Sequence, residues 1–128
     1  MTTMATQTPV EKTLVEFALG TISSFLKWDI LRVLYDSPEG VLSAAQVEAR
    51  TRRSPADVEA GLRALNADRI IVAVRSQGET RYRITHHSGL RRTIDSFLAA
   101  CHNRDFRLTV IQQMMRSEQP SGAAVARG

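Results

Sequence analysis

The strongest constraint on the fold is the order of patterns between residues 42 and 85, which begins with a capped helix. In "LSAAQV", Ser43 is a natural N-cap and Gln46 follows three residues later, so the two complete a capping box. Leu42 and Val47 occupy the positions of a hydrophobic staple around that cap. These features predict a short helix over residues 43–50.

A second capped helix follows after only the three residues "TRR". In "SPADVEAGLRAL", Ser54 is the N-cap, Pro55 fills the first helical position, and Asp57 faces the positive end of the helix dipole. The pattern predicts a helix over residues 54–68. Helical periodicity turns one side toward the core, namely Val58, Leu62 and Leu65. The opposite side carries small residues, with an arginine on its shoulder: Ala56, Ala60, Ala64, Ala67 and Arg63.

The period then changes from helical to extended. "IIVAVR" is rich in β-branched residues, "SQGE" is a turn in which Gly78 can take positive φ, and "TRYRIT" alternates strictly. This predicts a β-hairpin over residues 70–85, whose tip segment, residues 75–83, is called the wing below. The expected sheet has two strands.

Helical patterns flank this unit on both sides. We expect a helix over 10–19 stopped by Gly20, a helix over 23–35, and a long helix from about Ser88. "HNRD" at 102–105 could break the long helix, since Asn103 can end one helix and Asp105 can cap the next. The fold class is therefore mainly α (α+β), with one domain over 10–116 and disordered tails at 1–9 and 117–128.

Composition is that of an ordinary globular protein, with 43% hydrophobic and 23% charged residues in 128. The sequence contains neither an apolar run of membrane-spanning length nor a signal-peptide pattern, so we expect no membrane association. A lone cysteine, Cys101, fits a reducing compartment. These features favour a cytoplasmic protein.

Positive charge is concentrated in the middle of the chain. Residues 50–92 contain ten arginines and four acidic residues, a net charge of +6, whereas residues 1–49 carry −3 and residues 93–128 carry +1. A local excess of this size is typical of a surface that binds a polyanion.

Two helices joined by a short turn and followed at once by a hairpin form a winged helix-turn-helix arrangement. On the segment "ILRVLYDSPEGVLSAAQVEARTRRSPADVEAGLRALNADRIIV", then "GETRYRIT" and "HHSGL", the sequence resembles the winged helix regulators of bacteria, in the MarR-like, PadR-like and ArsR-like group. The resemblance covers about residues 24–92. It implies a homodimeric DNA-binding repressor or activator whose dimer interface is formed by helix 10–19 and the long helix after Ser88.

The resemblance implies that helix 54–68 enters the major groove and that the wing lies on the DNA backbone or in the minor groove. The expected DNA-binding residues are Arg50, Arg52, Arg53, Ser54, Ala56, Ala60, Arg63, Arg75, Arg81 and Arg83. On the helix, only Arg63 can donate a bidentate pair to guanine, while the alanines can touch thymine methyl groups. The remaining arginines are expected to contact phosphates.

Other interpretations also account for parts of the sequence. An alanine-rich helix face also suits a protein–protein interaction module that does not bind DNA. His86, His87, Cys101 and His102 lack the spacing of a metal site, and no catalytic arrangement is visible, so we expect no metal, no cofactor and no enzyme activity. The aromatic residues Phe25, Trp28 and Tyr35 fit core packing better than an effector pocket. The existence of a small-molecule effector stays open.

Overall fold

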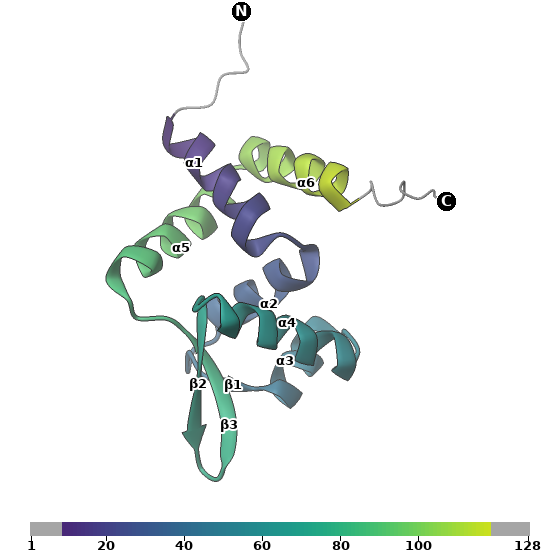
Figure 1. The fold of residues 1–128 in the computed structure, drawn as a ribbon, viewed down its shortest axis with the longest axis vertical. Helices are drawn as coiled ribbons and strands as arrows, with labels where there is room; N and C mark the ends of the chain where they lie inside the picture. The colour runs from purple at the N-terminus through teal and green to yellow at the C-terminus, as the bar shows by residue number, and fades with distance from the viewer. Residues whose placement is uncertain (1–8, 119–128) are drawn as a thin grey trace, which may run out of the picture. The chain divides into compact units, whose positions relative to one another are not determined.

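The computed structural model describes residues 9–118, which divide into two compact units (Figure 1). The terminal unit combines the two ends of the described chain, residues 9–24 and 93–118, and the central unit comprises residues 25–92. Most residues are helical, and one small antiparallel sheet lies in the central unit. Within residues 9–118, every helix is too short or too polar to cross a bilayer.

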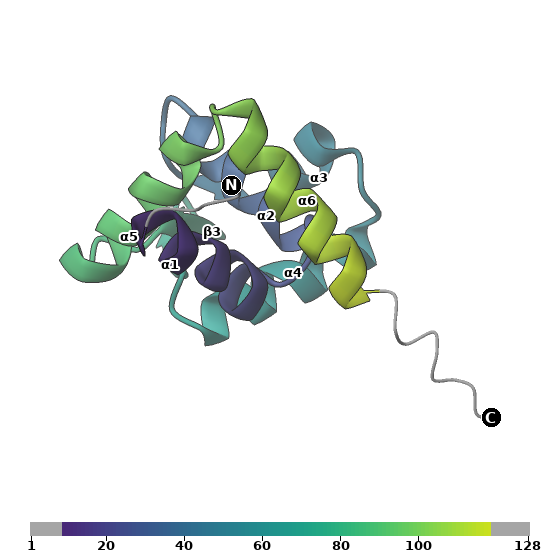
Figure 2. The same cartoon turned by 90° about the horizontal axis from the view of Figure 1, so that it is seen from above.

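The terminal unit begins with α1 (Pro9–Phe17), which continues as a π-helical segment, η1 (Ala18–Ile22). The prediction that this helix stops at Gly20 is wrong, because Gly20 lies inside η1. The segment ends instead at Ser23, which adopts φ 63° and donates its N–H to the carbonyl of Ala18 at 2.7 Å. Ala18 and Ile22 are fully buried, and η1 packs against α6 (Arg104–Glu118) (Figure 2). Burial of Ala18 and Ile22 therefore stabilises the helical conformation beyond Gly20.

The pattern after Ser88 forms two helices, α5 (Ser88–Ala100) and α6, separated at residues 101–103. The break falls at "HNRD", but its cap is not the expected one. Asn103 caps α6, since its Oδ1 accepts the N–H of Phe106 at 2.9 Å, and Asp105 lies within the first turn. Phe97 contacts Phe106 edge-on, with ring centroids 6.2 Å apart, so the break folds α6 back toward α5.

The predicted tails overlap two helices, because α1 begins at Pro9, inside the tail predicted for residues 1–9, and α6 reaches Glu118, inside the tail predicted for residues 117–128. The other positions of the expected tails, residues 1–8 and 119–128, lie outside the described residues.

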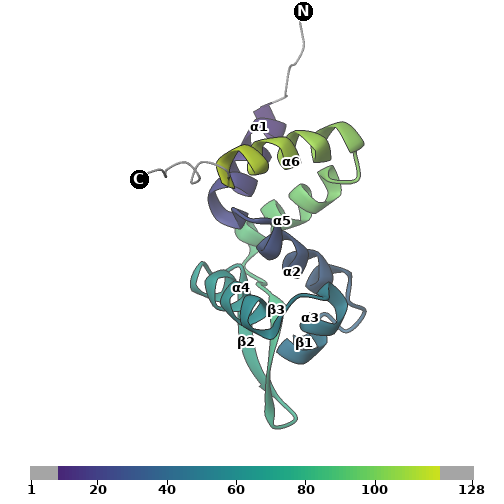
Figure 3. The ribbon, with the colours of Figure 1, turned by 90° about the vertical axis from the view of Figure 1, so that its right-hand side faces the viewer.

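The central unit contains α2 (Phe25–Asp36), α3 (Ala44–Thr51) and α4 (Pro55–Ala67), each of which contacts the other two (Figure 3). Both predicted helix caps are confirmed. Ser43 Oγ accepts the Gln46 N–H at 3.2 Å while Gln46 Oε1 accepts the Ser43 N–H at 2.8 Å. Ser54 Oγ accepts the Asp57 N–H at 3.1 Å. Local chemistry thus fixes where α3 and α4 begin.

The sheet has three strands in the order β1–β3–β2 rather than the two expected. β2 (Ile71–Ser76) and β3 (Glu79–Ile84) form the predicted hairpin, and the short β1 (Leu42–Ser43) adds to its other edge through Leu42 opposite Tyr82. The hairpin turn holds Gln77 at φ 53° and Gly78 at φ 80°, as a two-residue type I′ turn requires. The hairpin extends away from the helices of its unit (Figures 1 and 3).

Candidate nucleic-acid interface

Helix α4 is fixed by its inner face, which packs against α2. Val58, Leu62 and Leu65 are at most 2% exposed, as their spacing predicted. Gly61 lies where α4 packs closely on α2, because a Cβ there would be 2.5 Å from Ile30 Cδ1. This packing determines which side of α4 is left for a partner.

The outer face of α4 is exposed and consists mainly of small residues. Its exposed members are Ala56, Glu59, Ala60, Arg63, Asn66 and Ala67. Arg63 Nη2 donates to Glu59 Oε2 at 3.2 Å, and each of the two side chains is 72% exposed. Glu59 and Asn66 were missed by the sequence reasoning, although their spacing of four and three residues from Arg63 places all three on one side of the helix.

The turn between α3 and α4 is tied to α2 by an ion pair. Arg53 donates from Nε and Nη2 to Asp29 Oδ2, at 3.1 and 2.7 Å, with the side chains 31% and 43% exposed. Arg52 is exposed and ends α3 in a left-handed conformation, at φ 59°. Arg53 therefore has an intramolecular partner, whereas the Arg52 side chain lies in solvent.

The arginines of the wing organise the hairpin itself. Arg75 spans the turn, donating from Nη1 to Thr80 Oγ1 at 3.1 Å and from Nη2 to the Gly78 carbonyl at 3.0 Å. Arg81 Nη2 pairs with Glu79 Oε2 at 2.8 Å, while its buried Nε has no hydrogen-bond partner. Arg83 makes a longer contact, 3.4 Å, with the carbonyl of Ile84. Of these three arginines, only Arg75 is exposed.

The arginines of the central unit therefore lie in several distinct surroundings. Arg53 faces α2, Arg63 lies on the outer face of α4, and Arg75 lies at the tip of the wing. The Arg91 guanidinium lies 5.6 Å from the centre of the Tyr35 ring, a cation–π contact. The structure brings Arg63 and the exposed alanines together on one helix face, whereas Arg53, Arg75 and Arg91 contact other parts of the central unit.

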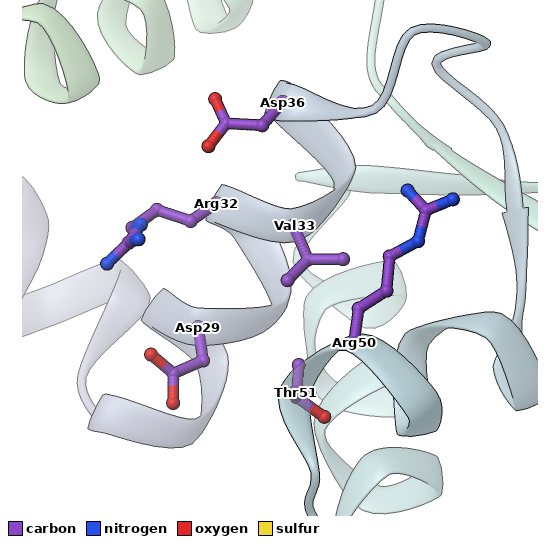
Figure 4. Close-up of a pocket in the computed structure, with 6 residues that line it drawn as sticks. All are labelled: Asp29, Arg32, Val33, Asp36, Arg50 and Thr51. Atoms are coloured by element: carbon purple, nitrogen blue, oxygen red, sulfur yellow. The ribbon is translucent and has the colours of Figure 1, made fainter.

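A polar cavity of about 300 Å³ lies between α2 and the end of α3 (Figure 4). It is lined by Asp29, Arg32, Val33, Asp36, Arg50 and Thr51. The close-up shows the two aspartates and Arg32 on α2, with Arg50 extending from α3 on the other side of Val33. Charged residues line this cavity, whereas Trp28 is buried and stacks on Phe25 with ring centroids 6.2 Å apart. The core role predicted for Trp28 agrees with this packing, whereas the same prediction for Tyr35 is wrong, because Tyr35 is exposed.

The loop between α2 and β1 contains an acidic side chain with a perturbed pKa. The pKa of Glu39 is lowered by a hydrogen bond to its own backbone and by the Ser37 hydroxyl, which donates to Glu39 Oε1 at 3.0 Å. The positive charges of Arg50 and Arg81 lower the Glu39 pKa further. Arg50 and Arg81 thus interact electrostatically with Glu39 in the loop between α2 and β1.

Potential metal ligands are not grouped in the described part of the chain. Among residues 9–118, no three His, Cys, Asp or Glu side chains lie close enough together to hold a metal ion. Cys101 is buried, and His86 and His87 are exposed immediately before α5.

Comparison with solved structures matches this arrangement to a known fold. The chain is similar to an ArsR-like transcriptional regulator from Rhodococcus sp. RHA1, with a TM-score of 0.51 and 24% sequence identity over 80% of this chain and 93% of that one. The chain has a winged helix fold. The fold expected from the sequence is thereby confirmed. No known family profile and no curated protein matches the sequence.

Proposed function

We propose that this winged helix protein is a DNA-binding transcriptional regulator that acts as a homodimer. In this proposal α4 enters the major groove of double-stranded DNA, and the wing lies against the backbone or the minor groove. The observation that carries the proposal is the outer face of α4. It is exposed, sterically small, and carries an arginine able to read guanine, while the opposite face is anchored in the core.

Phosphate contacts would come from the residues around α4. Arg50 and Arg52 at the end of α3 are exposed, so they can exchange water for phosphate oxygens at little cost. Arg75 on the wing is also exposed, but a phosphate would share its guanidinium with Thr80 and the Gly78 carbonyl. Arg53, Arg81 and Arg83 are half-buried and engaged within the protein. A phosphate contact by Arg53 or Arg81 would have to share the guanidinium with its carboxylate partner. The exposed N-cap Ser54 and the exposed α4 residues Ala56 and Ala60 would lie at the groove.

Dimerisation is proposed through the terminal unit. Its helices expose apolar side chains to solvent, with Val10 on α1 at 65% and Leu108 and Met115 on α6 at 39% and 51%. Leu108 and Met115 are seven residues apart and lie on the same side of α6, with the half-buried Ile111 beside them. A second copy of the chain would cover this strip.

The resemblance in fold supports a regulatory role, since the similar solved structure is that of a transcriptional regulator. We place the protein in the cytoplasm, where a bacterial regulator meets DNA. We assign no cofactor and no enzyme activity to the protein.

A titration of the purified protein with duplex DNA tests the proposal. The duplex should come from the region upstream of the protein's own coding sequence, and affinity should be measured at two salt concentrations. We expect affinity to fall steeply with salt because phosphate binding releases counterions. Equal and negligible binding at both salt concentrations would contradict the proposal.

A second function, docking of a partner protein, is favoured by one observation. The α4 face is neutral in sum, because Glu59 offsets Arg63, and its alanines would allow another helix to approach closely. This alternative predicts no salt-dependent binding of duplex DNA. It also predicts that Ala60→Glu abolishes binding of the protein partner.

A further inference from the structure

The geometry points to Glu59 and Arg63 as a joint reader of neighbouring cytosine and guanine bases, with Glu59 as the residue that excludes other sequences. This inference rests on the proposed function and deepens it. It names the class of DNA that α4 would accept, namely duplexes that place a guanine and a cytosine at adjacent positions of the major groove.

The ion pair between these residues contributes little to the folded protein. Both side chains are 72% exposed, and they interact at 3.2 Å across one helical turn. Exposed pairs of this spacing stabilise a helix only slightly, because solvent and salt screen them. Glu59 and Arg63 face outward among Ala56, Ala60 and Ala67. They are the only charged residues among the exposed members of the outer face of α4.

Their chemistry is complementary to a G·C-containing step. A guanidinium donates to guanine O6 and N7, whereas a carboxylate accepts from the amino group of cytosine. A carboxylate cannot donate, so it is repelled by phosphates and by the acceptor edges of guanine and thymine. Residues four apart on a helix are separated by about 6 Å along its axis, which is comparable with one to two base-pair steps of about 3.4 Å.

Glu59 therefore works by exclusion. On a matching duplex the carboxylate gains a donor and continues to orient Arg63. On any other duplex it sits in a negative groove without a donor, and the complex is weakened. Removing the charge should strengthen binding to random DNA and reduce discrimination, which is the opposite of what loss of an ordinary contact produces.

The experiment begins with selection of binding sites from random duplexes by the wild-type full chain. The selected duplex and a shuffled version of it are then titrated with wild type, Glu59→Gln and Glu59→Ala. We expect the wild-type sites to contain adjacent guanine and cytosine. In both variants we expect tighter binding of the shuffled duplex and a ratio of affinities smaller by about 5- to 100-fold.

Asp57→Asn is the matched control. It changes the net charge by the same amount on the same helix, but Asp57 lies in the first turn, away from the Glu59–Arg63 side. It should raise affinity for both duplexes alike and leave their ratio unchanged. If wild type binds duplex DNA and Glu59→Gln keeps the wild-type ratio, the inference is refuted while the proposed function stands. If wild type binds no duplex, the proposed function itself fails.

Discussion

At the residue scale, the role of each arginine depends on the group that its guanidinium contacts. Arg53 and Arg63 look alike in the chain, yet one pairs with Asp29 on another helix and the other with Glu59 on its own. We expect the two pairs to differ in their contribution to folding. The first joins two elements and is half-buried, whereas the second is exposed and local.

A pair of double-mutant cycles measures this difference. Arg53→Ala with Asp29→Ala should give a coupling free energy of about 1 kcal/mol, the upper end for partly exposed pairs. Arg63→Ala with Glu59→Ala should give a few tenths of a kcal/mol. Urea unfolding of each single and double variant supplies the values. Equal coupling in the two cycles would show that Arg53 does not hold the turn on α2.

Arg53→Ala, Arg81→Ala and Arg63→Ala also separate the proposed DNA contacts. Loss of a phosphate contact should weaken binding to all duplexes and reduce the salt slope by at most about one for Arg53 and for Arg81, because each guanidinium is shared with a carboxylate. Loss of Arg63 should instead reduce the ratio of the affinities for a selected duplex and a random one, because it removes a base contact. Titrations at two salt concentrations distinguish the two patterns. Unchanged discrimination in Arg63→Ala would refute base reading by α4.

Two glycines should respond in opposite ways to alanine. In Gly61→Ala the new methyl group meets the fully buried Ile30 Cδ1 at 2.5 Å and Leu26 Cγ at 3.2 Å. Overpacking should exceed the gain in helix propensity and lower the free energy of unfolding by about 1 kcal/mol. Gly20→Ala meets no atom within 4 Å, so it should raise that free energy by a few tenths to about 1 kcal/mol. Thermal unfolding of both variants would show whether close packing or propensity dominates at each site.

The Glu39 carboxylate should titrate below its ordinary range, and Ser37 is one reason. A carboxyl group whose pKa is lowered by folding stabilises the protein above its unfolded pKa, and that contribution is lost as pH falls through the folded value. In Ser37→Ala the pKa of Glu39 should rise toward its ordinary value because one donor is removed. NMR titration of the Glu39 carboxyl carbon would measure this, and an unchanged pKa would exclude the Ser37 hydrogen bond as a cause.

At the element scale, the break between α5 and α6 depends on one cap. Asn103→Ala should lower the free energy of unfolding by about 1 kcal/mol, since the N–H of Phe106 loses its acceptor. Asp105→Ala should cost only a few tenths of a kcal/mol, because Asp105 contributes through the helix dipole alone. Urea unfolding compares the two variants. A larger loss of unfolding free energy in Asp105→Ala than in Asn103→Ala would show that Asp105 is the cap, as the sequence predicted.

The elements that could be predicted are those encoded by neighbouring residues. Ser43, Gln46 and Ser54 specify helix starts through bonds to residues three positions away, and the turn at Gln77–Gly78 specifies the hairpin. The pairing of β1 with β3 joins residues about forty positions apart, so no local sequence pattern predicts it. Continuation of α1 through Gly20 likewise depends on burial of Ala18 and Ile22, which propensity does not include.

The candidate site follows the same division. Periodicity placed the alanines and Arg63 on the outer face of α4, because a helix repeats regularly. It could not reveal that Arg53, Arg75 and Arg81 are engaged within the protein, since each partner is chosen by the folded geometry. The concentration of arginine in the sequence therefore overstated how many guanidinium groups are available to DNA.

At the scale of the whole molecule, the proposed dimer links the terminal unit to DNA binding. Two copies of α4 would contact two half-sites, so losing the dimer should weaken duplex binding even though α4 is unchanged. The double variant Leu108→Glu/Met115→Glu places two carboxylates on the exposed apolar strip of α6, where burial against a second copy would remove them from water.

We expect this double variant to sediment as a monomer at concentrations where wild type is a dimer, and to bind a selected duplex at least tenfold more weakly. Arg116→Glu is its control, because it changes the net charge by the same two units at another exposed position of α6. The control should remain dimeric, since it leaves the apolar strip intact. Analytical ultracentrifugation combined with duplex titration separates the outcomes. A double variant that remains dimeric would show that the α6 strip is not the dimer interface. A monomeric double variant with wild-type affinity for DNA would show that one copy of α4 is sufficient for binding.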